Sequence, residues 1–253
     1  MTKILRHCLG VLVISLVVLG GTPSLQAAGI IVKDGQKIAF LGDSITANGW
    51  HNPAGYVNLT IAGLKANGIR VTAIPAGIAG HKSKQMLERL ELDVLDKKPD
   101  WLILSCGVND VWHGAQGVPL EEFKIYITVI IDKCHAAGVN VVILTATVIG
   151  EDLNNSYNKR LSSYNKFLRS LAQEKKCLLA DVNAMFQTLI KINPKPGRVL
   201  TSDGVHMNPD GDKVMAMGIL RVFGLNIRQM KKAQESWKNI FNKGMKKHEN
   251  FQY

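Results

Sequence analysis

Two short segments far apart in the 253-residue chain carry side chains suited to nucleophilic catalysis. Gly42-Asp43-Ser44 supplies a serine hydroxyl, and Asp203-Gly204-Val205-His206 places a carboxylate three residues before an imidazole. A neutral hydroxyl attacks a carbonyl poorly until a base accepts its proton, and an imidazole is a suitable base near neutral pH. The carboxylate can hold one ring nitrogen and leave the other free for that role. Taken singly, each segment is also typical of an ordinary turn.

Two further segments contain groups that can donate hydrogen bonds to a reacting oxygen. The glycines of Ala76-Gly77-Ile78-Ala79-Gly80-His81 can adopt positive φ and turn a backbone N–H toward a ligand. Gly107-Val108-Asn109-Asp110 adds the side-chain amide of Asn109. Such donors stabilise the negative charge that develops on a carbonyl oxygen under attack. Either segment alone is weak support, because glycine and asparagine are common in turns.

The hydrophobic pattern predicts the elements that position these segments. Apolar or β-branched runs predict five strands, at residues 37–41, 69–74, 101–105, 139–146 and 177–182. Helical patterns alternate with them, at residues 56–66, 86–95, 120–137, 157–174 and 209–223. This alternation predicts a mostly parallel sheet with right-handed crossovers, whose ligands bind beyond the carboxyl ends of the strands. We therefore expect all four segments at one edge of one sheet.

Single residues mark where several of these elements end or begin. Pro75 is expected to close the second strand, and Pro99 ends the second helical pattern. Gly138 is well placed to terminate the helix at 120–137. Asn208 and Pro209 have the residue types of an N-cap and a first helical position. No repeat or linker suggests a second domain, so we expect one domain over residues 29–225.

The four segments together resemble the SGNH hydrolases, also called GDSL esterases and lipases. The similarity lies in Gly42-Asp43-Ser44, in Gly80, in Gly107-Val108-Asn109-Asp110 and in Asp203-Gly204-Val205-His206, which occur in the family's order. It covers nearly the whole chain after residue 28 and is far more specific for fold and reaction than for substrate. The resemblance implies a flavodoxin-like three-layer αβα sandwich with a five-stranded parallel sheet.

The same resemblance assigns roles to individual residues. Ser44 is the expected nucleophile, with His206 as its base and Asp203 as the partner of the imidazole. The oxyanion hole is expected from the N–H groups of Ser44 and Gly80 and the side chain of Asn109. The family's glycine segment usually opens with an asparagine, whereas this chain has Pro75-Ala76 there, so Gly77 is a rival to Gly80 as donor. No metal or organic cofactor is expected.

Bulky or polar neighbours of these segments are candidates for substrate contact. We expect this role for five residues, Asp43, Trp50, His81, Trp112 and His113, with His51 beside Trp50. Indole faces suit the apolar faces of sugar rings as well as acyl chains. The alternative is that either tryptophan packs under a loop. The histidines show neither a carboxylate pattern nor helical spacing, so no metal site is predicted.

The N-terminal segment has the composition of an export signal. Lys3 and Arg6 precede an apolar stretch at residues 9–19, and Ser24-Leu25-Gln26-Ala27-Ala28 follows, with Leu25 and Gln26 where small residues are preferred. The apolar stretch is shorter than the roughly 20 residues that span a bilayer. We therefore predict a signal peptide at residues 1–28 and a secreted or periplasmic protein, and leave open whether the signal is cleaved or kept as an anchor.

The other end of the chain is strongly basic. The formal net charge is +11, and residues 226–253 contain seven lysines and arginines against two glutamates. We expect this basic C-terminal tail to be helical or partly disordered, and to make at most weak electrostatic contact with an anionic surface. It carries no nucleic-acid motif, and no nucleic-acid partner is predicted.

These observations predict an exported serine esterase that acts on O-acetyl or short acyl groups of carbohydrate. Export, the tryptophan and histidine neighbours and the lack of a long exposed apolar stretch favour a small ester or acylated carbohydrate as substrate. A lysophospholipase or general short-chain lipase or esterase is the alternative, and a non-catalytic carbohydrate-binding module is a third. No strand is followed by the glycine motifs of P-loop or dinucleotide enzymes, which excludes those classes.

Overall fold

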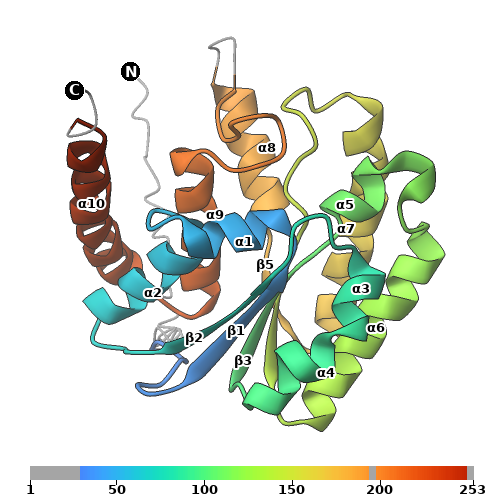
Figure 1. The fold of residues 1–253 in the computed structure, drawn as a ribbon, viewed down its shortest axis with the longest axis horizontal. Coiled ribbons are helices and arrows are strands. Elements are labelled where there is room, and N and C mark those ends of the chain that lie inside the picture. The colour runs from blue at the N-terminus through green and yellow to red at the C-terminus, as the bar shows by residue number, and fades with distance from the viewer. Residues whose placement is uncertain (1–28, 194–197, 250–253) are drawn as a thin grey trace, which may run out of the picture.

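The computed structural model of the protein contains a central five-stranded sheet (Figure 1). It describes residues 29–193 and 198–249, and side chains as far as residue 241, so the predicted signal peptide lies outside the described residues. The strands are β1 (Lys37–Gly42), β2 (Thr72–Gly77), β3 (Trp101–Ser105), β4 (Asn140–Leu144) and β5 (Leu178–Ala180). They lie in the order β2-β1-β3-β4-β5 and every neighbouring pair is parallel. This confirms the predicted flavodoxin-like fold.

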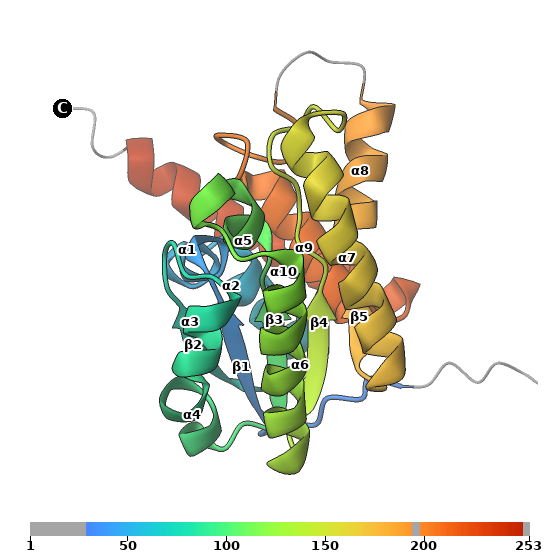
Figure 2. The same ribbon diagram turned by 90° about the vertical axis from the view of Figure 1, so that its right-hand side faces the viewer.

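Helices cover both faces of the sheet (Figures 1 and 2). One layer contains α1 (Ser44–His51), α2 (Tyr56–Ala66), α8 (Val182–Ile192), α9 (Pro209–Val222) and, outside α2, α10 (Ile227–Glu249). The other contains α3 (Ser83–Glu88), α4 (Leu90–Asp93), α5 (Val108–Trp112), α6 (Leu120–Ala136) and α7 (Ser156–Glu174). The short 3-10 turns η1 (Leu95–Lys97) and η2 (Gly114–Gln116) follow α4 and α5.

Several predicted boundaries are confirmed, because local chemistry determines them. β3 has the predicted limits, and all five of its residues are buried, as expected for a strand covered on both faces. α6 ends before Gly138, whose φ of +74° is easily adopted only by glycine. Asn208 caps α9 by accepting hydrogen bonds from the N–H groups of Asp210 and Gly211, and Pro209 follows as the first helical residue.

The second strand differs from the prediction. Pro75 does not close it but lies within β2, opposite Phe40 of β1, and the strand continues to Gly77. β2 is an edge strand, and an edge tolerates proline because one side of its backbone has no strand to bond. Ala76 and Gly77 therefore belong to the strand, and the loop toward His81 begins only at Ile78.

Three helical regions also differ from the prediction. The pattern at 86–95 is divided among α3, α4 and η1, because the chain leaves helical geometry at Arg89 and Val94. α1 was not predicted, because its sequence has no strong apolar repeat. α8 was missed although Val182, Phe186 and Leu189 recur at helical spacing.

The basic segment after residue 225 is helical over α10, and that helix packs on α2. Its Ala233 and Trp237 are buried, and the Trp237 indole N–H donates to the Leu59 carbonyl at 2.8 Å. Four of its basic side chains, Arg228, Lys231, Lys232 and Lys238, are exposed. In the first half of the basic tail, one face of the helix is apolar and packs on the domain, and the other face is charged and exposed to solvent.

Trp237→Ala should therefore destabilise the whole domain. Loss of a fully buried tryptophan typically lowers the free energy of unfolding by about 3–5 kcal/mol, which urea unfolding followed by circular dichroism would measure. Ile227→Ala is the matched control, because Ile227 lies in the same helix and is 91% exposed. That control should change stability by less than about 0.5 kcal/mol. Similar small effects of both substitutions would contradict the docking of α10.

Candidate active site

The candidate nucleophile stands at the junction of β1 and α1. The strand ends at Gly42 and the helix begins at Ser44, and a Cβ on Gly42 would overlap the side chain of Thr46. Asp43 is the N-cap of α1, and its Oδ1 accepts a hydrogen bond from the Ile45 N–H at 2.9 Å. Ser44 is therefore the first residue of a helix, where backbone N–H groups lack helical partners and favour negative charge.

The structure brings Ser44, His206 and Asp203 into one hydrogen-bonded chain. The His206 Nε2 lies 2.9 Å from the Ser44 Oγ, and its Nδ1 lies 2.6 Å from the Asp203 Oδ2. The second carboxylate oxygen of Asp203 accepts from the backbone N–H groups of Val205 and His206 at 2.8 and 2.7 Å. A hydroxyl, an imidazole and a carboxylate are thus aligned in the order that serine-dependent acyl transfer requires.

The surroundings of Asp203 keep its carboxylate charged. Partial burial raises the pKa of Asp203, but the hydrogen bonds from the His206 ring and from two backbone N–H groups outweigh it and bring the pKa to about 2. At neutral pH the carboxylate is therefore ionised and can orient the imidazole. It can also stabilise the positive charge that the ring would acquire on accepting a proton.

A glutamate not identified from the sequence holds the segment that carries Asp203 and His206. Glu151, in the loop after β4, accepts hydrogen bonds from the backbone N–H groups of Val199, Leu200 and Thr201, at 2.5 to 2.9 Å. It also accepts from the Thr201 hydroxyl at 2.7 Å. Next to it, the Gly150 N–H donates to the Gly204 carbonyl at 2.7 Å. The loop after β4 therefore fixes the loop before α9.

The predicted donor Gly80 lies in the turn after β2, and the predicted donor Asn109 lies in α5, after β3. Asn109 is buried in α5, and its Nδ2 donates to the His81 carbonyl at 3.2 Å. Gly80 stands in an exposed turn with a φ of +77° and open space around its Cα. Gly107, with a φ of +120°, turns the chain from β3 into α5. A side-chain amide and a backbone amide thereby follow the ends of β3 and β2, the two strands that flank β1.

Gly77, the rival donor, has a separate structural reason to be glycine. It pairs with Gly42 at the end of β2, and a Cβ there would overlap the backbone nitrogen of Ala47 in α1. Its lack of a side chain lets α1 pack directly on β2. This packing role leaves Gly80 as the better candidate for the oxyanion donor.

Asp43 does not contact the surface of the site, contrary to the prediction that it binds substrate. It is only 2% exposed, and burial raises its pKa to about 7. Asp110 is likewise buried, and it accepts hydrogen bonds from the backbone N–H and the hydroxyl of Ser83. The two carboxylates are structural: Asp43 caps α1, and Asp110 joins the start of α3 to α5.

Comparison with known proteins agrees with this geometry. The model of the GDSL-like Lipase/Acylhydrolase family matches residues 40–214. The chain belongs to that family. This membership confirms the resemblance in the four sequence segments, and the protein is a carboxylic ester hydrolase.

Several relatives of this GDSL hydrolase are acetylxylan esterases. One from Geobacillus stearothermophilus is 27% identical over 215 residues, which cover 76% of this chain and 96% of that protein. The crystal structure of the acetyl xylan esterase AlAXEase is 34% identical, covers 73% of this chain and 98% of its own, and has a TM-score of 0.68. Axe2, an acetylxylan esterase of Geobacillus stearothermophilus, is 25% identical, covers 77% and 97%, and has a TM-score of 0.70.

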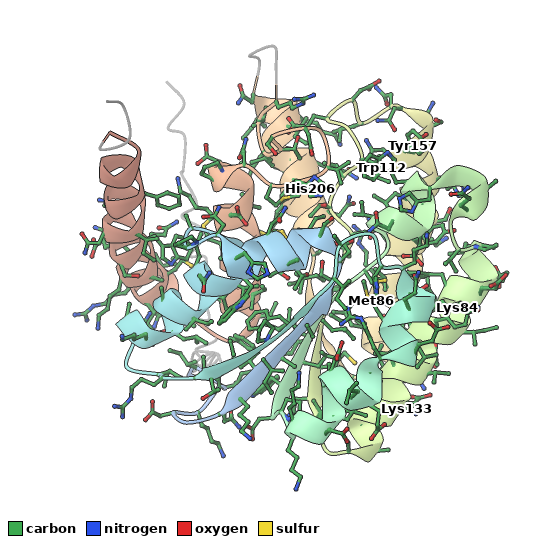
Figure 3. All side chains as sticks on the ribbon, viewed as in Figure 1. Lys84, Met86, Trp112, Lys133, Tyr157 and His206 are labelled. Atoms are coloured by element: carbon green, nitrogen blue, oxygen red, sulfur yellow. The ribbon has the colours of Figure 1, made fainter. Side chains whose placement is uncertain are left out.

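The predicted aromatic and histidine neighbours have different surroundings in this GDSL hydrolase. Trp112 is 39% exposed and stacks on His113 with ring centroids 6.0 Å apart, and Figure 3 labels Trp112 and His206 in the upper half of the molecule. Trp50 is half-buried and packs against the core. The His81 Nδ1 accepts a hydrogen bond from the Arg89 Nε at 3.2 Å. Burial, and to a smaller extent the charge of Arg89, lowers the pKa of His81.

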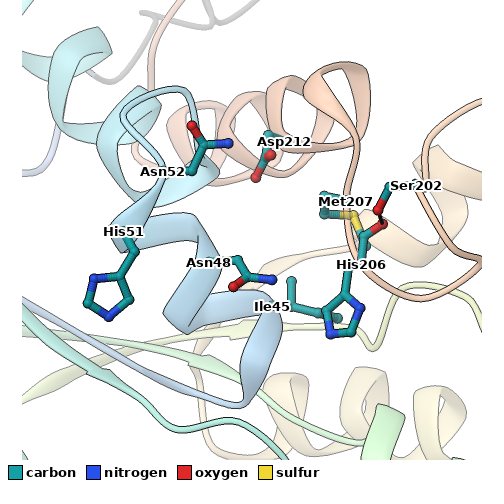
Figure 4. Close-up of a pocket in the computed structure, with 8 residues that line it drawn as sticks. All are labelled: Ile45, Asn48, His51, Asn52, Ser202, His206, Met207 and Asp212. Atoms are coloured by element: carbon teal, nitrogen blue, oxygen red, sulfur yellow. Dashed lines mark hydrogen bonds between the residues drawn. The ribbon is translucent and has the colours of Figure 1, made fainter. Parts of the chain in front are cut away.

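A pocket of about 410 Å³ opens beside His206 (Figure 4). It is lined by Ile45, Asn48, His51, Asn52, Ser202, His206, Met207 and Asp212. Burial raises the pKa of Asp212 to about 7, although a hydrogen bond from the Tyr56 N–H lowers it in part. Most of these residues were missed, because the face of α1 that lines the pocket is recognisable only once α1 itself is known.

The described residues form neither a metal site nor a membrane-spanning helix. Across residues 29–193 and 198–249, no three His, Cys, Asp or Glu side chains are grouped so as to hold a metal ion. Over the same residues, no helix has the length and apolar composition needed to cross a membrane.

Glu151→Gln should loosen the segment that carries Asp203 and His206. Weakening the bonds to three backbone N–H groups should lower the free energy of unfolding by about 1–3 kcal/mol at neutral pH, and should lower kcat on p-nitrophenyl acetate. Asp152→Asn is the matched control, because within the described residues the side chain of the neighbouring Asp152 accepts only the Asn154 N–H. Equal stability and kcat in both variants would contradict the role of Glu151.

The effect of Glu151 should depend on pH. Burial raises the pKa of Glu151, but the bonds from Thr201 and the three backbone N–H groups outweigh it and lower the pKa below its ordinary value of 4.5. A lowered folded-state pKa gives stability that is present above the unfolded-state pKa and is lost as the pH falls. The stability gap between the parent and Glu151→Gln should therefore narrow as the pH falls below about 4.5.

Proposed function

We propose that this protein is an exported serine esterase that removes O-acetyl or other short acyl groups from carbohydrate. The observation that carries the proposal is the hydrogen-bonded chain from Ser44 through His206 to Asp203 at the edge where β1 and β3 end. The acetylxylan esterases among the relatives support the carbohydrate ester. Export rests on the sequence of residues 1–28, and a weak contact of the basic α10 with an anionic surface stays a prediction.

In the proposed mechanism, His206 begins as the base. Its Nε2 accepts the Ser44 proton as the Oγ attacks the ester carbonyl, and the ionised Asp203 stabilises the resulting imidazolium. The new C–O bond pushes the carbonyl electrons onto oxygen. His206 then protonates the leaving alcohol, and water attacks the acyl-enzyme by the same route.

Negative charge on the carbonyl oxygen would be met by the N–H groups of Ser44 and Gly80 and by the Asn109 side chain. A side-chain amide has two N–H donors. One of those on Asn109 is held by the His81 carbonyl, which orients the amide and leaves the other for the reacting oxygen. A donor fixed before the reaction stabilises the transition state without reorganising during it.

The lining of the pocket beside His206 favours carbohydrate over a lysophospholipid. Asn48, Asn52 and Asp212 present polar groups that suit the hydroxyls of a sugar, and the described lining contains no lysine or arginine for a lipid phosphate. A non-catalytic binding module is also disfavoured, because such a module would not require a serine hydroxyl 2.9 Å from a carboxylate-bound imidazole.

The direct test of substrate class compares acetylated xylo-oligosaccharides with medium-chain lysophospholipids. We expect a higher kcat/KM on the sugar acetates. The mature protein would be assayed for the release of acetate from the sugars and of fatty acid from the lysophospholipids. A higher kcat/KM on the lysophospholipid would reverse the assignment.

A fluorophosphonate probe should label the parent, whereas a protein that only binds sugars would stay unlabelled.

Ser44→Ala should lower kcat on p-nitrophenyl acetate by more than about a thousandfold, because no other hydroxyl can form the acyl-enzyme. The far-UV circular dichroism spectrum and the urea midpoint should stay close to those of the parent, since within the described part of the chain the Ser44 hydroxyl is bonded only to His206. Turnover at the parent rate would remove Ser44 from the mechanism.

Asn109→Ala should lower kcat by about 10²–10³-fold with little change in KM, because its hydrogen bond strengthens only in the transition state. Asn140→Ala is a matched control. Its Nδ2 also donates to a backbone carbonyl at 3.2 Å, but at the opposite end of the sheet. The control should keep the parent kcat. An effect of Asn109→Ala confined to KM would exclude the oxyanion role.

A further inference from the structure

We propose that the pocket between α1 and α9 is a glycosyl subsite that holds the sugar whose ester is cleaved, and that Asp212 accepts a hydrogen bond from one of its hydroxyls. The inference rests on the proposed function and adds to it the place and the recognition of the alcohol half of the substrate. It is carried by the position of the pocket, by an Asp212 oxygen without a partner in the described residues and by the mixed lining.

The position follows from the path of the proton. His206 must deliver a proton to the leaving alcohol, so the alcohol oxygen lies within hydrogen-bond reach of its Nε2. The pocket is bordered by His206 and Ile45, whereas Gly80 and Asn109 do not line it. The acyl oxygen would therefore face the donor loops, and the alcohol would extend to the opposite side, over α1 and toward α9 (Figure 4).

Asp212 supplies an acceptor that the fold itself does not use. Its Oδ1 accepts the Tyr56 N–H at 2.8 Å and so caps α2, whose own N-cap Gly55 has no side chain. The residue is only 6% exposed, and its second oxygen has no hydrogen-bond partner among the residues that the structure describes. That oxygen is not among the fully buried side-chain atoms without a partner in the described residues, and Asp212 lines the pocket, so the oxygen is open to a group bound there. A hydroxyl donor in the pocket would satisfy it.

The rest of the lining matches a neutral ring with hydroxyls. The side chain of Asn48 makes no bond within the described part of the protein, and the Asn52 Oδ1 holds the Ala54 N–H, which leaves the Asn52 NH₂ group as a donor. Ile45 and Met207 add apolar surface for the C–H face of a ring. The volume of about 410 Å³ lies in the range of roughly 300–1,000 Å³ typical of small-molecule sites.

An anionic alcohol fits this pocket less well. The described residues that line it include one carboxylate and no lysine or arginine. A phosphate ester would meet the Asp212 carboxylate without a compensating cation, which is repulsive in a partly buried site. The pocket therefore favours an uncharged glycosyl group over the phosphorylated headgroup of a lysophospholipid.

Asp212→Asn isolates the unpartnered oxygen. Asparagine has the same shape and keeps a carbonyl oxygen for the Tyr56 N–H, so the cap of α2 is preserved, but the second oxygen becomes an NH₂ group. The measurement is the ratio of kcat/KM on acetylated xylobiose to kcat/KM on p-nitrophenyl acetate. The small aromatic leaving group of the second ester carries no hydroxyl besides the esterified one. We expect the ratio to fall about tenfold, as for loss of one hydrogen bond.

Two further variants control for charge and for folding. Asp210→Asn removes the same charge from the same turn of α9, but Asp210 is exposed, pairs with Lys213 and does not line the pocket, so the ratio should stay within about twofold of the parent. Asn48→Ala changes an exposed side chain of α1 to a good helix former, so it should fold normally and still lower the ratio about threefold or more.

The outcomes separate this inference from the proposed function. If the parent cleaves both esters and neither Asp212→Asn nor Asn48→Ala changes the ratio, the subsite is wrong and the esterase stands. If the parent cleaves p-nitrophenyl acetate but no acetylated sugar, the carbohydrate proposal fails and the subsite fails with it. Calorimetric titration of Ser44→Ala and Ser44→Ala/Asp212→Asn with acetylated xylobiose should show weaker binding by the double variant. Equal affinity would overturn the role of Asp212.

Discussion

The hydrogen bond between the Ser44 hydroxyl and the His206 ring is the constraint on which the rest of the site depends. Its two partners are 162 residues apart, and a 2.9 Å contact requires both backbones to be fixed independently. Ser44 is fixed by the tight turn from β1 into α1, where Gly42 and Gly77 allow close packing. His206 is fixed from the other side by Glu151 and Gly150, which bind the segment before α9.

The parallel sheet makes this convergence possible. Its strands all end at one edge, so the loops after β1, β2, β3 and β4 meet there although they are separated in sequence. In the proposed mechanism two of these segments would supply N–H donors and one the nucleophile, and the loop after β4 supports the segment that carries His206. The pocket at α1 and α9 is lined by His206 but not by Gly80 or Asn109, so the acyl oxygen and the alcohol of a bound ester would point in different directions from the Ser44 oxygen.

The sequence predicted those parts of the site whose chemistry is local. Ser44 follows a buried apolar run, and Asp203 and His206 lie three residues apart, so residue type and spacing were sufficient to find them. Asp212 and Glu151 escaped notice because each binds backbone about 50 or more residues away, which no local pattern records. The prediction that Pro75 ends the second strand was wrong for a related reason. A strand can contain proline when it lies at the edge of a sheet, and the position of β2 at the edge is a property of the whole sheet.

The carboxylates around the site act in two opposite ways. Asp203 has its pKa lowered to about 2, so the stability it contributes is present above its unfolded-state pKa and is lost as the pH falls toward 2. Asp43 and Asp212 cap α1 and α2 from buried positions that raise each pKa to about 7, so their contribution is largest at low pH and declines as the pH rises through that value. Rigid helix starts next to the nucleophile therefore cost stability at neutral pH, while full negative charge is concentrated on the carboxylate that faces His206.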